Sequence, residues 1–247
     1  MRTAWSAWCA VVMALWCVIM VPAIIAGLTF LPRDWVFKYA TGSVKIAFAL
    51  MRVRVRVHGR ENWNVREPYV LMGNHVNLLD PFTFACAFER YFVAIEKREN
   101  FKVPFYGWLM MRWGNIPIDR SDRTEAIRTM AVATKDFASD AWIVVLPEGT
   151  RTRNGKLGPF KKGGFHMALS SGVRIAPFTQ VGAWDVMCTG KGKWRVHAGT
   201  IDLYLHPPID ASNWGSDRLD ELMATVRNVI AAPLGEAEPV RELAAVH

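Results

Sequence analysis

The feature that most constrains this chain is its N-terminal stretch, residues 3–32, which contains no Asp, Glu, Lys, Arg or His. One continuous helix of 30 residues would reach about 45 Å at roughly 1.5 Å per residue, more than the hydrocarbon core of a bilayer. Trp5, Trp8 and Trp16 lie in the stretch, and tryptophan favours the membrane–water interface. The sequence therefore predicts N-terminal helices, within residues 1–50, that engage a membrane.

Two features of this stretch leave its exact form open. Pro22 and Gly27 interrupt the apolar run, so both a spanning helix and a bent or re-entrant pair of helices fit it. A cleaved signal peptide is a third reading. That reading is disfavoured because a single basic residue, Arg2, precedes the run and because the run is too long for a signal peptide.

The positive charge of the chain is concentrated beside the apolar stretch. Residues 1–60 hold eight Lys or Arg and one acid, a net +7, whereas residues 61–247 hold 22 basic and 21 acidic residues. The positive-inside rule then places the rest of the chain on the cytoplasmic side of the inner membrane. A basic collar also attracts anionic lipid headgroups. Nucleic acid is not expected as a partner, because no nucleic-acid-binding motif accompanies the charge.

The remainder of the chain is predicted to be one α/β domain. With 51% apolar and 21% charged residues, the composition excludes disorder, and four cysteines without a CxxC pair support neither a zinc site nor a disulfide scaffold. Strands and helices alternate, which predicts an α/β fold with a sheet of about seven strands flanked by helices over residues 51–232. Residues 233–247 are predicted to be a frayed tail. The expected strands are 52–58, 69–73, 91–95, 115–118, 142–146, 173–179 and one or two within 194–205, and the expected helices are 81–90, 104–113, 122–139, 162–171 and 216–231.

The first motif that carries chemistry is NHVNLLDP at residues 74–81, directly after an apolar strand. His75 and Asp80 would diverge by about 140° on a regular helix, so they meet only if the segment turns. Asp80 suits a helix N-cap and Pro81 the first helical position, which supplies the turn. An imidazole held by a carboxylate is the base–orienter pair of general-base catalysis. Taken alone, a capping Asp and an unrelated loop His explain HxxxxD equally well.

Three further segments hold the other distinctive polar residues. GNIPIDR at 114–120 ends in Arg120, which suits a phosphate or carboxylate or, alternatively, a surface ion pair. LPEGTRT at 146–152 follows a buried strand, and there Glu148 could accept from a hydroxyl and Arg151 could bind an anion, a solvated turn being the alternative. FKKGGF at 160–165 precedes a helix, where its two lysines could neutralise phosphates.

In order and in spacing, NHVNLLD, GNIPIDR, LPEGTRT and the IAPF strand at 175–178 resemble the motifs of the glycerolipid acyltransferase family. The resemblance runs from about residue 40 to about residue 210 and is nearest to the bacterial 1-acyl-sn-glycerol-3-phosphate O-acyltransferases. It implies a glycerol-3-phosphate acyltransferase-like fold with a mixed, mostly parallel sheet, a tunnel for an acyl chain and N-terminal helices that engage the membrane. It implies transfer of a fatty acyl group from a thioester to the sn-2 hydroxyl of lysophosphatidic acid, giving phosphatidic acid in phospholipid biosynthesis.

The resemblance also assigns roles to residues. His75 resembles the general base and Asp80 the carboxylate that orients it. The residues that resemble the acceptor-binding blocks are Arg120, Glu148, Gly149, Thr150 and Arg151. The candidates for the donor or oxyanion site are Lys97, Pro177 and Asn74. No metal and no cofactor is expected, since a thioester is a good leaving group; the co-substrate is acyl-CoA or acyl carrier protein.

Two departures from the family pattern bear on the acceptor. Asn77 stands where the family often has Ser, and Leu146 where it often has Phe. The alternatives are therefore another lysolipid acceptor, such as a lyso-ornithine lipid or another lysophospholipid, and a non-catalytic lipid-binding protein anchored in the membrane. No Ser adjoins His75 and GxSxG is absent, so direct transfer is favoured over an acyl-enzyme.

Overall fold

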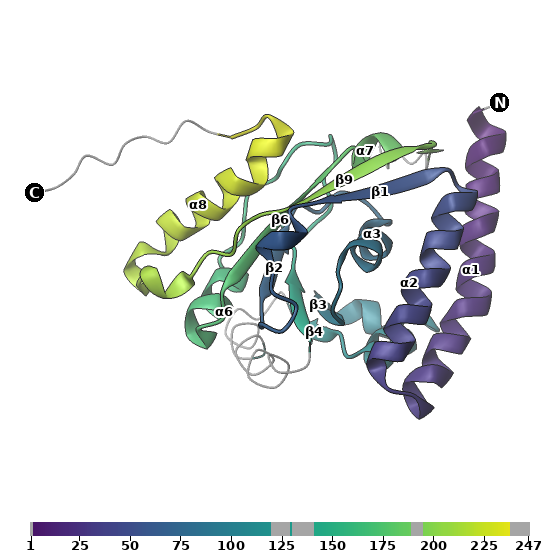
Figure 1. The fold of residues 1–247 in the computed structure, drawn as a ribbon, viewed down its shortest axis with the longest axis horizontal. Coiled ribbons are helices and arrows are strands. Elements are labelled where there is room, and N and C mark those ends of the chain that lie inside the picture. The colour runs from purple at the N-terminus through teal and green to yellow at the C-terminus, as the bar shows by residue number, and fades with distance from the viewer. Residues whose placement is uncertain (1, 120–128, 130–140, 189–194, 238–247) are drawn as a thin grey trace, which may run out of the picture.

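The computed structural model describes residues 2–119, 129, 141–188 and 195–237, and its centre is a seven-stranded sheet (Figure 1). The strands of this sheet are β1 (Val53–His58), β2 (Val70–Gly73), β3 (Phe92–Lys97), β4 (Ile116–Ile118), β5 (Trp142–Val145), β6 (Ile175–Val181) and β9 (Gly199–Leu205). Each falls within three residues of the range that the sequence predicts. Residues 195–205 contain two strands, β8 (Arg195–Val196) and β9, and β8 pairs with β7 (Met187–Cys188) in a small second sheet.

The strand order places the polar motifs at one edge of the sheet. The order is β1-β9-β6-β2-β5-β3-β4, and every neighbouring pair is parallel except β6 with β9. The carboxyl ends of β2, β3, β4, β5 and β6 therefore share one edge, the edge where α/β folds hold their sites. The predicted fold class, a mixed and mostly parallel α/β sheet, is confirmed.

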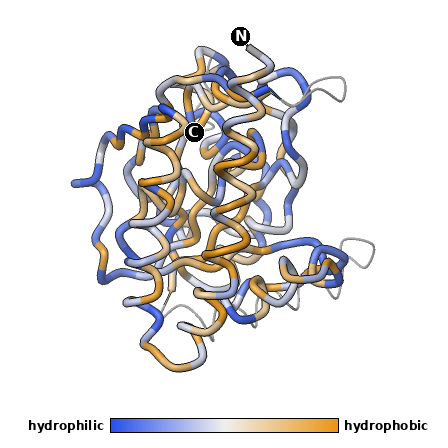
Figure 2. Tube along the Cα trace, turned by 90° about the vertical axis from the view of Figure 1, so that its right-hand side faces the viewer, coloured by the Kyte–Doolittle hydropathy of each residue, from blue (hydrophilic) through white to orange (hydrophobic). Residues whose placement is uncertain are grey.

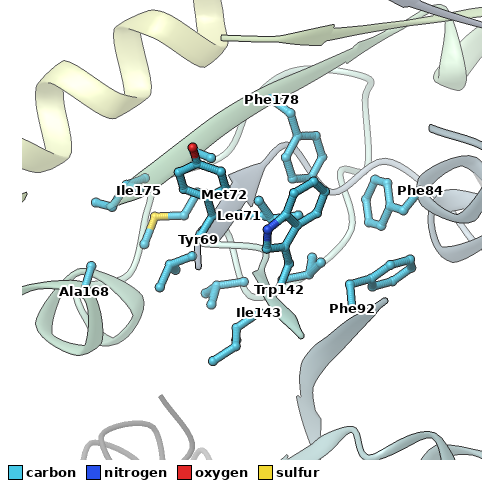
Figure 3. Packing of buried hydrophobic residues seen from close by; sticks show 14 of the residues in the cluster. Tyr69, Leu71, Met72, Phe84, Phe92, Trp142, Ile143, Ala168, Ile175 and Phe178 are labelled. Atoms are coloured by element: carbon cyan, nitrogen blue, oxygen red, sulfur yellow. The ribbon is translucent and has the colours of Figure 1, made fainter. Parts of the chain in front are cut away.

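Helices cover the sheet and explain why its central strands are apolar along their whole length. The helices are α1 (Arg2–Phe30), α2 (Arg33–Leu50), α3 (Asp80–Ala87), α4 (Tyr106–Trp113), α6 (Gly163–Ser171), α7 (Ala183–Val186) and α8 (Leu219–Ala231). All residues of β2 and β5 are buried, as expected for parallel strands with both faces covered. Figure 3 shows Tyr69, Trp142 and Phe178 among the side chains of this core. The helix predicted over 122–139 falls, apart from residue 129, outside the described residues.

The N-terminal stretch forms one long helix and pairs with a second. α1 is continuous through Pro22, and Trp8 Nε1 donates to the carbonyl of Leu50 at 3.1 Å, so α1 and α2 run antiparallel. Figure 2 shows this pair facing the viewer, with long hydrophobic stretches. Residues Thr3–Phe30 are long and apolar enough to cross a membrane, by length and composition alone.

Both ends of α1 contact the α/β domain. Near its start, Ser6 Oγ accepts from the amide of Val196 at 3.2 Å, and in its last turn Thr29 Oγ1 accepts from Arg112 Nη1 at 3.2 Å. Between these points Cys9 and Val12 are buried in a core cluster that also contains residues of β1, β8 and β9. The helix therefore lies along the domain for its whole length and completes part of its core.

The predicted frayed tail lies largely outside the described residues. Its first residues are described: Ala232–Leu234 forms a short 3-10 turn, and Glu236 Oε2 accepts from the amide of Leu157 at 3.0 Å. The start of the predicted tail thus contacts the loop after β5.

Candidate active site

The loop after β2 brings His75 and Asp80 into contact. His75 Nδ1 lies 2.7 Å from Asp80 Oδ2. The aspartate side chain is 1% exposed and the histidine side chain 24% exposed. No group in the described part of the chain is hydrogen-bonded to His75 Nε2. One ring nitrogen is thus held by a buried carboxylate, and the other is left for a substrate.

Asp80 also shapes the loop that carries His75. Its Oδ2 accepts from the amide of Val76 at 2.8 Å, and its Oδ1 from the amide of Asn77 at 3.1 Å. The helix α3 begins at Asp80 itself, and its cap makes no side-chain hydrogen bond. The expectation that Asp80 caps this helix is therefore wrong, because its carboxylate turns back onto the loop instead of forward onto the helix. That backward turn is what closes the five-residue separation between His75 and Asp80.

Glu148 holds the same loop from the neighbouring strand. Its Oε1 accepts from the amide of His75 and its Oε2 from the amide of Gly158, both at 2.7 Å. The amide of Thr152 also donates to the carbonyl of His75 at 2.9 Å. Burial raises the pKa of Glu148 above its usual value, and the two amide hydrogen bonds and His75 partly oppose that rise. Both oxygens of Glu148 are thus occupied by backbone groups, a positioning role that the sequence reasoning did not foresee.

Two asparagines of the motif are also bound to backbone. Asn74 Nδ2 donates to the carbonyl of Gln180 at 2.9 Å, and its Oδ1 accepts from the amide of Gln180 at 2.8 Å. Asn77 Nδ2 donates to the carbonyls of Ala183 and Met187 at 2.8 and 3.0 Å. These contacts tie the His75 loop to β6 and α7. The side-chain amide of Asn74, a candidate for the oxyanion site, is committed to this tie.

Positive charge lies on the turn that follows β5. Thr150 and Arg151 are exposed, and Gly149 has a φ of +67°. A methyl group on Gly149 would lie 3.0 Å from Lys161 Nζ, so the glycine leaves room for that ammonium group as well as for the turn. Of the two lysines in FKKGGF, Lys161 therefore faces the turn, whereas Lys162 pairs with Asp220 at 2.7 Å.

A second polar group, not foreseen from the sequence, surrounds Glu96 at the end of β3. Its carboxylate accepts from Tyr106 Oη at 2.8 Å and from Asn115 Nδ2 at 2.9 Å. Partial burial raises the pKa of the Tyr106 hydroxyl, Glu96 raises it further, and Arg151 partly opposes both effects. Arg151 is therefore close enough to act electrostatically on this group, which links the turn after β5 to α4.

The remaining predicted residues are scattered. Lys97 is the last residue of β3 and pairs with Glu99 at 3.3 Å. Pro177 is buried within β6 beside Met72, away from the strand ends. Arg120 lies outside the described residues. The structure thus brings together His75, Asp80, Glu148 and the turn 149–152, while Lys97 lies on a neighbouring strand end.

The site offers acid–base chemistry and anion binding. A half-buried imidazole with a carboxylate on one nitrogen can take a proton on the other. The cations of the turn after β5, which is hydrogen-bonded to the His75 loop, favour an anionic ligand. Across the ranges that the structure describes, no cluster of three or more His, Cys, Asp or Glu side chains is arranged to hold a metal ion.

Comparison with known proteins places these features in context. A sequence model of the family described as Acyltransferase matches residues 54–181. The 1-acyl-sn-glycerol-3-phosphate acyltransferase of Escherichia coli K12 is 33% identical over 175 residues, covering 68% of this chain and 68% of that protein. The chloroplastic enzyme BAT2 of Brassica napus is 34% identical, over 71% of this chain and 49% of its own length. A Chlamydomonas reinhardtii relative with the same activity in its name is 30% identical, and the match spans 53% of it. The chain thus spans about half to two thirds of the length of these relatives.

One solved structure resembles the whole fold. The crystal structure of the 1-acyl-sn-glycerophosphate acyltransferase PlsC from Thermotoga maritima superposes with a TM-score of 0.80. The match covers 95% of each chain at 24% sequence identity. At that identity the likeness speaks for the fold alone.

Proposed function

The chain belongs to the acyltransferase family, and on that premise we propose that it transfers a fatty acyl group from an acyl thioester to the sn-2 hydroxyl of lysophosphatidic acid. The names of its relatives support this acceptor. The observation that carries the proposal is the contact of 2.7 Å between His75 Nδ1 and Asp80, with Nε2 directed away from that contact. An alcohol is a weak nucleophile at neutral pH, so its acylation needs such a base.

The proposed reaction is a direct transfer. His75 Nε2 takes the proton of the acceptor hydroxyl as its oxygen attacks the thioester carbonyl carbon. The tetrahedral intermediate then collapses, the carbon–sulfur bond breaks, and the thiolate leaves and takes up a proton from the imidazolium. Asp80 keeps the proton of the neutral ring on Nδ1 and stabilises the imidazolium. A positioned base of this kind contributes about 10²–10⁴-fold to the rate.

The acceptor phosphate is proposed to bind the cations on the turn after β5. Arg151 is exposed there, and Lys161 lies against Gly149 of the same turn. Arg120 is proposed as a further phosphate ligand on the strength of the motif it belongs to. Glu148 is proposed to act through the loop it holds, since both of its oxygens already accept from backbone amides.

The donor is proposed to be acyl-CoA or acyl carrier protein, with no additional cofactor. The tunnel for the acyl chain also stays a prediction. Lys97 and Pro177 stay candidates for the donor side, because Lys97 ends a strand at the site edge and Pro177 belongs to the strand that anchors Asn74.

The location is proposed to be the cytoplasmic face of the inner membrane, with the α1–α2 pair entering one leaflet. A helix that crossed the bilayer would put its ends on opposite sides, yet both ends of α1 touch the same domain. Of the arrangements that the sequence allows, a re-entrant pair of helices therefore agrees best with the fold.

The test is release of thiol from acyl-CoA by the purified full-length protein in mixed micelles containing lysophosphatidic acid. His75→Ala and Asp80→Asn are expected to slow release by about 10²–10⁴-fold while the thermal unfolding of His75→Ala stays near that of the wild type. The control is His58→Ala, which removes a histidine that also lies 2.7 Å from a carboxylate, that of Asp202, at the first strand of the sheet. Normal turnover in both site variants would refute the roles of His75 and Asp80. No turnover by the wild type, with lipid binding retained, would favour a lipid-binding protein without catalysis.

The same assay decides the acceptor. Lysophosphatidic acid is expected to be used faster than lyso-ornithine lipid and other lysophospholipids. Asn77, one of the two departures that raised this question, is buried and bound to the carbonyls of Ala183 and Met187. It therefore gives no reason to prefer a different headgroup.

A further inference from the structure

The helix α4 and the residues before it display apolar side chains that belong neither to the core nor to the site. Phe105 is 63% exposed and Trp108 54% exposed, and Val103 and Met111 are about half exposed. The Phe105 and Trp108 rings contact each other with centroids 5.3 Å apart. Adjacent exposed aromatic and aliphatic side chains of this size mark an interaction surface. We call residues 103–111 the α4 surface.

The backbone of Phe105 is unfavourable for the residue it carries. Its φ of +61° and ψ of −53° lie outside the regions that a bulky side chain adopts easily. Such conformations persist where the surrounding structure enforces them and cluster at functional positions. Here the conformation turns a large aromatic ring outward at the start of α4, where a glycine would meet the backbone requirement at less cost.

The other face of α4 fixes this surface beside the N-terminal helices. Leu109 is buried with Ile24 of α1 and with Val36 and Ala40 of α2. Arg112, near the end of α4, donates to Thr29 in the last turn of α1. The C-terminal end of α4 therefore lies next to the last turn of α1.

The turn between α1 and α2 is itself apolar and exposed. Phe30 is 83% exposed, and Leu31 and Trp35 are about half exposed. This apolar turn and the α4 surface therefore belong to elements that contact each other through Arg112 and Thr29.

The charges around the two apolar surfaces complement anionic lipid headgroups. The exposed basic residues of these two segments are Arg33, Lys38, Lys102 and Arg112, and they outnumber the exposed acid of the turn, Asp34. Aromatic side chains bordered by basic ones are typical of elements that lie in the headgroup region of a bilayer.

We propose that the α4 surface is a second membrane-insertion element, with Phe105 and Trp108 entering the bilayer beside the α1–α2 turn. Its occupant is the lipid bilayer surface, not a second protein. Because Tyr106 of the same helix donates to Glu96 at the end of β3 at 2.8 Å, the element sets the height of the catalytic edge above the lipid. The proposal adds to the proposed function and does not depend on which acceptor is used.

The test places the photoreactive residue p-benzoylphenylalanine at position 105 of the full-length chain in vesicles of phosphatidylethanolamine and phosphatidylglycerol. Position 30 serves as the lipid-facing reference. Ala224, exposed on α8 at the far end of the molecule (Figure 1), serves as the control. After irradiation, position 105 is expected to yield lipid adducts at a level comparable to position 30 and at least about tenfold above position 224.

Two results would overturn the proposal: a lipid adduct at position 105 no greater than at position 224, or an adduct at 105 mainly to a second protein chain. At positions 105 and 30 the probe replaces one exposed aromatic ring by another. Unfolding temperatures identify any variant, including that at position 224, that does not fold. A second variant with the probe at Trp108 repeats the measurement without changing the backbone at Phe105.

Discussion

His75 is positioned by two buried carboxylates, one on the segment that follows β2 and one on the turn that follows β5. Asp80 holds the ring and the amides of Val76 and Asn77, and Glu148 holds the amide of His75 itself. A carboxylate offers several acceptor positions and no donor, so each of these residues can bind more than one N–H group at once. Asn at position 80 or Gln at position 148 would turn its side-chain NH₂ group, a donor, toward one of these N–H donors.

The pKa of Glu148 gives a prediction on pH. It is raised in the folded state, chiefly by burial, so between the ordinary and the raised value the folded protein binds more protons than the unfolded one. The free energy of unfolding therefore falls as pH rises through that window. In Glu148→Gln this component of the pH dependence is expected to vanish, and stability at neutral pH to fall by about 1–3 kcal/mol because one amide loses its acceptor.

Thermal unfolding of the wild type and of Glu148→Gln from pH 4 to pH 8, in the same detergent, measures this effect. The pH window begins at the ordinary glutamate pKa of about 4.3 and ends at the raised pKa of Glu148. Glu61→Gln, at an exposed position, is the control and is expected to leave the profile unchanged. Parallel profiles for the wild type and Glu148→Gln would contradict the assignment.

At the scale of elements, the loop after β5 holds the loop after β2 in place through Glu148. The carboxylate of Glu148 accepts from the amide of His75 in one loop and from the amide of Gly158 in the other. A methyl group on Gly158 would lie 2.9 Å from Glu148 Oε2, the atom that its own amide binds. Gly158→Ala is expected to displace the carboxylate, to cost about 1–3 kcal/mol of stability and to lower the rate of thiol release.

The matched control is Gly42→Ala, in α2, where a methyl group would meet nothing within 4 Å. It is expected to raise stability by about 0.5–1 kcal/mol, since alanine favours the helix. Chemical denaturation and the thiol assay on both variants check the pair. Full activity in Gly158→Ala would show that the position of the Glu148 carboxylate does not affect the function of His75.

The elements were predictable where a local pattern decides them. The alternation RVRVRVH marks β1, and the run WIVVL marks the buried strand β5, because burial on one face or both fixes the periodicity. The His75–Asp80 pair was also predictable from its motif. The direction of the Asp80 carboxylate was not, since the loop amides and the helix amides compete for it and only the folded loop decides between them.

The contact between Glu148 and His75 could not be predicted from a local sequence pattern either. Glu148 and His75 are 73 positions apart in sequence, and they meet only because β5 lies beside β2 in the sheet. The exposed ring of Phe105 likewise depends on a positive φ that no pattern of residue types predicts. The pairing of distant strands determines the Glu148–His75 contact, and the backbone conformation of Phe105 determines where its ring points. Local helix and strand propensities determine neither feature.

At the scale of the whole molecule, the packing of α1 along the domain makes a prediction on topology. Thr3→Cys and Leu50→Cys place thiols at the start of α1 and at the end of α2, both exposed and both at the end of the helix pair opposite its turn. If the α1–α2 pair enters one leaflet, a membrane-impermeant maleimide is expected to label both positions from the cytoplasmic side only. Right-side-out and inverted membrane vesicles compare the two sides, and the wild type gives the background from its four cysteines. Labelling of the two positions from opposite sides would show that α1 crosses the bilayer.

The contribution of α1 to the core has a consequence for biogenesis. Cys9 and Val12 are buried in one cluster with Met51, Val53 and Val196. The helix that is proposed to contact lipid therefore also contributes side chains to the core of the domain. Before the chain reaches a membrane, either the apolar side chains of α1 that face away from the domain are exposed to water, or α1 does not dock and the core cluster around Cys9 and Val12 stays incomplete. Completion of this part of the core is therefore coupled to the docking of α1 on the domain.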